Sequence, residues 1–119
     1  MLVVSNTSPI LNLAVIDCLQ LLREQFGEVF VPPGVVRELR LDSGYPGTPQ
    51  IKQALTEGWL QEVALENLQV FAALKRELDE GESEAIALAL QLGIKSILID
   101  ERDGRSAAKA MGLEPTGIL

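Results

Sequence analysis

Short apolar runs alternate along the chain with longer stretches in which apolar residues recur at helical spacing. The short runs are typical of strands buried in a parallel sheet, and the longer stretches are typical of helices that cover such a sheet. The pattern predicts strands at 2–5, 29–31, 59–63 and 96–99, the third of them an edge strand, and a last short strand within 113–119. It predicts helices at 9–15, 19–26, 33–39, 50–57, 67–78, 80–92 and 103–111.

The alternation of strands and helices predicts the architecture. Parallel strands need crossover connections, and these are right-handed with few exceptions. We therefore expect residues 1–119 to form one domain, a three-layer α/β/α sandwich with a mostly parallel central sheet. Residues 41–48 are rich in Gly, Pro, Ser and Asp, which predicts a surface loop with Tyr45 as an exposed aromatic residue.

The first helix and the stretch 79–101 carry the clearest local signals. Ser8 is the expected N-cap of the first helix, with Pro9 as its first residue. Asp79 is the expected N-cap of an Ala- and Leu-rich helix that stops at Gly93. The strand that follows ends in Asp100 and the acid after it. Ligands of open α/β sheets bind at the carboxyl ends of the strands, so these acids face the edge where a site is expected.

Composition restricts the function. Ten Lys and Arg against seventeen Asp and Glu give a net charge of −7, which excludes a protein that binds nucleic acid through an excess of positive charge. A nuclease remains possible, because bound divalent cations supply local positive charge. The absence of histidine excludes Ser-His and Cys-His nucleophiles and histidine-rich zinc sites. We expect a cytoplasmic protein, because neither a signal peptide nor a membrane-spanning run is evident.

Four places along the chain carry the candidate site. Asn6 follows the first strand and Glu38 lies on the helix after the second strand. Glu82 and Glu84 begin the central helix, and Asp100, Glu101 and Asp103 follow the fourth strand. Carboxylates without His or Cys select hard cations, so the expected cofactor is Mg²⁺ or Mn²⁺.

Each of these acids also has a purely structural interpretation. Glu82 with Asp79 fits a capping box, and acids in the first helical turn interact favourably with the helix dipole. Glu84 fits a solvated helix face, Glu38 fits an ordinary surface glutamate, and Asp103 fits the N-cap of the last helix. Only their joint pattern favours a metal site.

That joint pattern resembles the PIN domain family, in particular its compact prokaryotic group similar to VapC-type toxins. The resemblance spans nearly the whole chain. The residues that carry it are 4–9 (VSNTSP), 31–38 (VPPGVVRE), 81–89 (GESEAIALA) and 98–105 (LIDERDGR). It implies a parallel sheet with helices on both faces, metal-dependent endoribonuclease activity, and a cognate antitoxin as an inhibitory partner.

Carried over by residue, the resemblance implies an acidic site of Glu38, Glu82 and Asp100, with Asn6 at the position usually held by Asp. Thr7 and Ser8 resemble the hydroxyl residues beside the first acid, which implies Ser8 as an additional site residue that positions the metal or water. Whether Asp100 or Glu101 is the acid after the fourth strand stays open, as does a role of Arg102 or Arg105 in contacting phosphate. The resemblance also implies a further strand or helix beyond Leu119.

The neutral amide of Asn6 lowers the expected metal affinity, which favours a first alternative function. A second alternative rests on the α/β fold alone. One is a catalytically weak or inactive PIN-like module that binds RNA or an antitoxin-like protein. The other is a metal-dependent phosphatase, which the absence of a Gly-rich phosphate loop disfavours. We also expect a homodimer, because the Leu-rich helices carry more apolar surface than one thin sheet covers.

Overall fold

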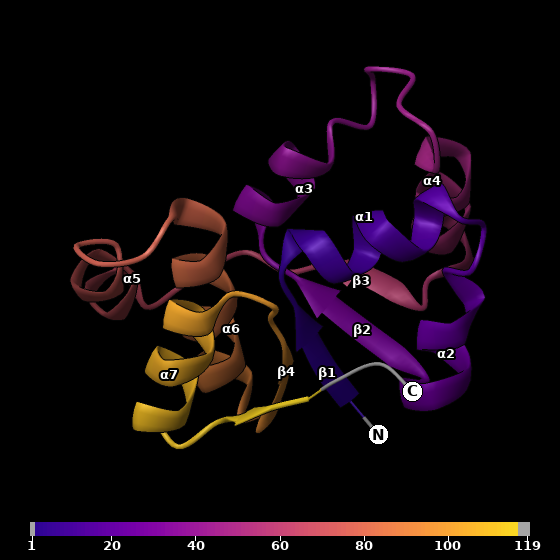
Figure 1. Ribbon diagram of the computed structural model, residues 1–119. Helices are drawn as coiled ribbons and strands as arrows, with labels where there is room; N and C mark the ends of the chain where they lie inside the picture. The colour runs from indigo at the N-terminus through magenta and orange to yellow at the C-terminus, as the bar shows by residue number, and fades with distance from the viewer. Residues whose placement is uncertain (1, 117–119) are drawn as a thin grey trace.

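The computed structural model describes residues 2–116 of the chain (Figure 1). The strands are β1 (Leu2–Ser5), β2 (Glu28–Val31), β3 (Leu60–Glu62), β4 (Ser96–Leu98) and β5 (Glu114–Pro115). The helices are α1 (Thr7–Val15), α2 (Gln20–Phe26), α3 (Pro33–Leu39), α4 (Thr48–Glu57), α5 (Leu68–Leu74), α6 (Glu80–Leu92) and α7 (Arg102–Ala110).

The five strands form one parallel sheet in the order β3-β2-β1-β4-β5. The prediction of a mostly parallel sheet is therefore confirmed. The chain runs outward from β1 to β3 on one side and then returns to β4 and β5 on the other side. The strand order therefore reverses between the neighbouring strands β1 and β4. Ligands of open α/β sheets bind in the crevice at the carboxyl ends of the strands beside such a point.

Helices cover both faces of the sheet, as the three-layer prediction requires. Alternate side chains of the strands point to opposite faces, so Val3 and Leu98 pack with α1–α4, and Val4 and Ile97 pack with α6 and α7. In Figure 1 the two groups of helices lie on opposite sides of the strands. No helix among residues 2–116 is both long and apolar enough to cross a membrane.

Several boundaries differ from the sequence predictions. The first helix begins at Thr7 with Asn6 at its N-cap, so the prediction of Ser8 as cap and Pro9 as first residue was wrong. The helix predicted at 67–78 ends at Leu74, and the chain then turns so that Leu78 is buried.

The last helix and strand differ as well. Glu101 is the N-cap of α7, which places Asp103 inside its first turn instead of at the cap. Within the predicted strand 113–119 the structure shows β5, and residues 117–119 lie outside the described part.

Candidate functional site

Asn6 and Glu38 come together over the start of α6. Asn6 follows β1 and is only 6% exposed, whereas Glu38 lies on α3, which packs against α6. Gly81 shows how close the two side chains are to α6 and to each other. A Cβ atom at that glycine would overlap Glu38 Oε1 and would lie 3.1 Å from Asn6 Oδ1. The Thr7 hydroxyl donates a hydrogen bond of 2.9 Å to Glu38 Oε1 and so orients this carboxylate.

Glu82 lies one residue further along α6 and is buried, with 4% of its surface exposed. Its Oε2 atom sits against the backbone of α7, because a Cβ atom at Gly104 would be only 2.6 Å from it. A methyl group at Gly104 would displace this oxygen. Among residues 2–116, Glu82 Oε2 has no hydrogen-bond partner.

Burial and like charges make the ionised form of Glu82 costly. Burial raises the pKa of Glu82 to about 7, and the carboxylates of Asp79 and Glu101 add to the rise. The Asp79 backbone N–H opposes it by hydrogen bonding to the Glu82 carboxylate. In return, the Asp79 side chain accepts a hydrogen bond of 2.8 Å from the Glu82 backbone N–H, so the predicted capping interaction is present. Capping therefore does not remove the electrostatic cost at Glu82.

Asp100 lies on the other face of the sheet. Side chains alternate along β4 and beyond, and Ile99 packs on the α6 side, so Asp100 points toward α1. There it is exposed and lines a cavity of about 290 Å³ with residues of α1 such as Pro9 and Leu13. Glu101, rather than Asp100, acts on the pKa of Glu82.

Glu84 is not the solvated residue that the sequence suggested. It is 4% exposed and lies against α3. Its carboxylate accepts hydrogen bonds from the Gly34 backbone N–H at 3.0 Å and from Arg37 Nη2 at 3.2 Å. The guanidinium of Arg37 also pairs with Glu80 at 2.8 Å. Glu84 therefore joins α6 to α3, and this contact holds Glu38 next to Gly81.

The remaining candidates lie around this group. Ser8 is half-buried in the first turn of α1. Asp103 is exposed on α7, where it borders a hollow with Glu77 and Ser106. Arg105 donates a hydrogen bond of 3.0 Å to the Ile99 carbonyl.

The available oxygen donors fit a hard cation with few protein ligands. Within residues 2–116, no group of three or more His, Cys, Asp or Glu side chains is arranged to hold a metal ion. Mg²⁺ in nucleotide-processing sites, however, commonly keeps several waters and uses one or two carboxylates together with substrate phosphates. Asn6 Oδ1 and Glu38 Oε1 converge over Gly81, and the buried Glu82 Oε2 has no partner among the described residues. These oxygen atoms suit Mg²⁺ or Mn²⁺ in their chemistry. Asn6 Oδ1 and Glu38 Oε1 lie at Gly81 of α6, whereas Glu82 Oε2 lies at Gly104 of α7.

Sequence reasoning missed the glycines of this site. Gly81 and Gly104 leave space for the carboxylates of Glu38 and Glu82, which a methyl group at either position would displace. Both glycines lie in the first turn of a helix, although glycine has a low helix propensity. A glycine in the first turn of a helix beside a candidate acid is the signal that could have identified them. Thr7 was noted beside Asn6, but its contact with Glu38 spans 31 positions of sequence and depends on packing.

Comparison with known proteins identifies a family for the chain as a whole. No curated protein and no solved structure gives a significant match. A family model described as a PIN domain matches residues 2–119, which is nearly the whole chain. The parallel sheet with helices on both faces is consistent with the match. The chain therefore belongs to the PIN domain family.

Proposed function

We propose that this chain is a metal-dependent endoribonuclease of the toxin–antitoxin type, which cleaves RNA phosphodiesters in the cytoplasm with Mg²⁺ or Mn²⁺. Membership of the PIN domain family supports a nuclease fold. The observation that carries the proposal is the convergence of Asn6 Oδ1 and Glu38 Oε1 over Gly81, at the carboxyl edge of the sheet.

In this proposal Asn6, Glu38 and Glu82 hold the cation. A bound Mg²⁺ or Mn²⁺ would supply Lewis-acid activation of water and would neutralise charge on the phosphoryl oxygens. The Thr7 hydroxyl keeps Glu38 in its binding rotamer through the 2.9 Å hydrogen bond. Glu82 is buried beside α7, so its carboxylate is fixed and partly shielded from water.

The acid after the fourth strand is the least defined part of the set. Glu101 is close enough to raise the pKa of Glu82, whereas Asp100 lines the cavity beside α1. We therefore favour Glu101 at this position over Asp100. Glu101 can reach Glu82 on the α6 side of the sheet, whereas Asp100 points to the α1 side and cannot.

Calorimetric titration with Mn²⁺ tests the metal site. We expect saturable binding in the wild type and binding weaker by about tenfold or more in Glu38→Gln, as for loss of a metal-supporting group. Glu24→Gln is the matched control, because Glu24 is an exposed glutamate on α2, away from the sheet edge. The absence of saturable Mn²⁺ binding in the wild type would remove the catalytic proposal.

Cleavage of single-stranded RNA tests the activity. We expect cleavage with Mn²⁺, none in EDTA, and a strong loss in Glu38→Gln. Asn6→Asp adds a carboxylate at a site where the amide brings no charge, so we expect tighter Mn²⁺ binding and faster cleavage. Equal Mn²⁺ affinity in Asn6→Asp would show that residue 6 lies outside the metal shell.

Partners follow from the same proposal. The net charge of −7 favours a basic protein as the antitoxin-like partner. A homodimer is also proposed, because Val15, Ile16 and Leu68 leave more than half of their surface exposed. Sedimentation of the purified chain, alone and with a candidate partner, measures both associations.

A second function is an inactive PIN module that binds RNA or a protein partner. The observation that favours it is the buried, uncharged Asn6 at the centre of the site. The two functions differ in one measurement. If RNA cleavage appears in Asn6→Asp and is absent in the wild type, the native chain is a binding module.

A further inference from the structure

A groove runs between the end of α3, the loop after it and the first half of α4. Two neighbouring hollows, of about 640 and 440 Å³, form this α3–α4 groove, and they share Leu41, Asp42 and Lys52. Arg37 lines the first hollow and Tyr45 lines the second. Each hollow is larger than the roughly 300 Å³ at which pockets for organic ligands begin. In Figure 1 the loop of the groove projects from the molecule between α3 and α4.

The groove carries positive charge that the protein itself does not neutralise. Arg40 and Lys52 are exposed, and neither of them forms a salt bridge within residues 2–116. The charge of Arg37 is already paired with two acids of α6. Asp42 also lines the groove and offsets one of the two free charges. The groove therefore stays positive, although the chain as a whole has a net charge of −7.

Arg40 occupies a backbone conformation that glycine and asparagine adopt most readily. It follows α3 with φ of 51° and ψ of 60°, which is the left-handed region. Residues in such sparsely populated conformations are frequent at functional sites. The Arg40 carbonyl accepts hydrogen bonds from the Ser43 backbone N–H at 3.0 Å and from the Ser43 hydroxyl at 2.6 Å. This turn fixes the backbone at Arg40, whose side chain lines the groove.

Tyr45 is the one exposed aromatic residue within residues 2–116, with 53% of its surface accessible. Its backbone N–H donates to Ser43 Oγ at 3.3 Å, and its carbonyl accepts from the Thr48 N–H at 3.1 Å. Gly47 packs the loop against α1, because a Cβ atom there would be 2.7 Å from Ala14 Cβ. A loop that is already ordered loses little conformational entropy when it binds a ligand. The ring of Tyr45 is therefore available for stacking.

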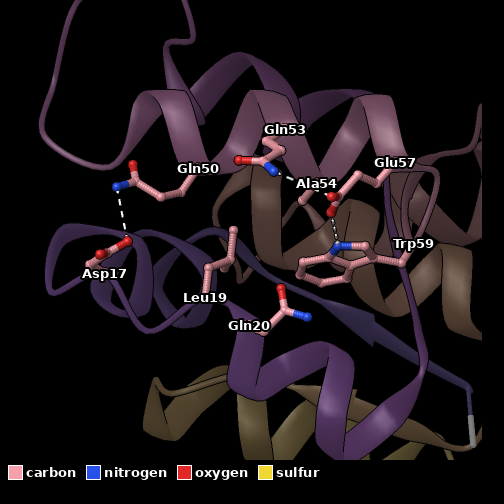
Figure 2. Close-up of a pocket in the computed structure, with 8 residues that line it drawn as sticks. All are labelled: Asp17, Leu19, Gln20, Gln50, Gln53, Ala54, Glu57 and Trp59. Atoms are coloured by element: carbon pink, nitrogen blue, oxygen red, sulfur yellow. Dashed lines mark hydrogen bonds between the residues drawn. The ribbon is translucent and has the colours of Figure 1, made fainter.

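A hollow on another side of α4 lacks these features (Figure 2). Its volume is about 150 Å³, and the charged side chains that line it are the acids Asp17 and Glu57. Figure 2 shows that these acids accept hydrogen bonds from Gln50 and from the Trp59 indole. A polyanion would be repelled there. The side of α4 that carries Lys52 is the side that suits phosphate groups.

Unpaired cations beside an exposed aromatic ring are the combination that binds single-stranded nucleic acid. The cations contact phosphates of the backbone, and the ring stacks on a base. We propose that the α3–α4 groove binds single-stranded RNA, with Arg40 and Lys52 on phosphates and Tyr45 stacked on a base. The choice of RNA rests on the proposed function. Arg37 at the end of the groove precedes Glu38 on α3, so a strand in the groove leads to the candidate metal site.

Fluorescence anisotropy with a labelled oligouridylate measures this binding, in EDTA so that no metal-dependent cleavage occurs. We expect Arg40→Asn and Lys52→Gln each to weaken binding. Each should also reduce the slope of log K against log salt by about 0.7, as for the loss of one phosphate contact. Asparagine tolerates the left-handed backbone at residue 40, so the fold is kept. Asp42→Asn should tighten binding, because it removes an acid that lines the groove.

Arg76→Asn and Lys109→Gln are the matched controls. Both residues are exposed and lie outside the groove, Arg76 after α5 and Lys109 in the last turn of α7. They change the total charge by the same amount as the groove variants, so we expect a much smaller loss of affinity. Equal losses in the controls and the groove variants would show binding through overall charge alone and would overturn the proposal.

Tyr45→Ala tests the stacking. We expect it to bind RNA about tenfold more weakly with an unchanged salt slope, because stacking involves no phosphate. Inorganic polyphosphate has no bases, so it should bind the wild type more weakly than RNA does and should not distinguish Tyr45→Ala from the wild type. Equal affinity of the wild type for RNA and polyphosphate would overturn the proposal. Equally tight binding of oligoglutamate would do the same, since the groove would then suit an acidic protein.

The groove and the proposed cleavage fail in different ways. Unchanged RNA affinity of Arg40→Asn and Lys52→Gln in EDTA would overturn the groove, whether or not the wild type cleaves RNA. Loss of affinity in these variants, with affinity kept in the controls, would support the groove even if the wild type shows no cleavage with Mn²⁺.

Discussion

Glu82 provides the sharpest test of the electrostatics at the candidate site. Its carboxylate is 4% exposed and lies near Asp79 and Glu101. The substitution Glu82→Gln keeps the size and shape of the side chain but removes the ionisable group. The variant therefore separates the cost of a buried charge from the packing of α6 against α7.

The magnitude follows from the pKa of Glu82, which rises from an ordinary 4.5 to about 7 in the folded protein. Between these pH values the folded chain keeps a proton that the unfolded chain has lost. The stability that this proton provides is present in full below pH 4.5 and is lost as the pH rises through 7. The rise in pKa of Glu82 corresponds to about 3 kcal/mol.

Urea denaturation in EDTA, followed by circular dichroism, measures this effect. We expect the free energy of unfolding of Glu82→Gln, relative to wild type, to increase by about 3 kcal/mol between pH 4.5 and pH 8. Glu24→Gln changes an exposed glutamate and should show no such trend. A difference between Glu82→Gln and wild type that is constant over this pH range would refute the reasoning. At pH 8, Mn²⁺ should stabilise the wild type more than Glu82→Gln, because binding to the folded state adds to its stability.

Two further predictions separate folding from function. Gly81→Ala places a methyl group against Glu38 Oε1 and beside Asn6 Oδ1, so Mn²⁺ affinity should fall by about tenfold or more in calorimetry. The melting temperature should be kept or raised, because alanine favours the helix. Unchanged Mn²⁺ affinity would contradict the observed site geometry. Glu84→Ala should lower the free energy of unfolding by about 2–3 kcal/mol in urea, because it leaves a buried backbone N–H without its acceptor. Glu80→Ala, which removes the exposed acid on the same arginine, should cost less than about 1 kcal/mol, and equal losses for the two variants would contradict the burial of Glu84.

The local chemistry of the sequence was sufficient to predict the helices, the strands and the class of fold. Strand and helix periodicities predicted the five strands and the seven helices found in residues 2–116, and helix–strand alternation predicted a parallel sheet. The Asp79 cap and the Gly93 stop of α6 were also predicted, since both depend on neighbouring backbone groups only. These features are readable because propensity, capping and periodicity act over a few residues.

The composition of the site was decided by packing between distant segments. The contact of Thr7 with Glu38 spans 31 positions, and that of Gly34 with Glu84 spans 50. Nothing local to Glu84 distinguishes it from a solvated residue, because its burial results from the packing of α3 against α6.

The face of the sheet on which each acid lies was also decided by tertiary packing and not by the sequence alone. The sequence alone placed Asp100 and Glu101 at the carboxyl end of the fourth strand and Asn6 at the end of the first. Only the tertiary structure shows that α1 meets Asp100, and that α6 and α7 meet Glu82 and Glu101. The physical reason is that a strand fixes the alternation of its side chains, whereas the long crossover from β3 to β4 decides which helix covers each face.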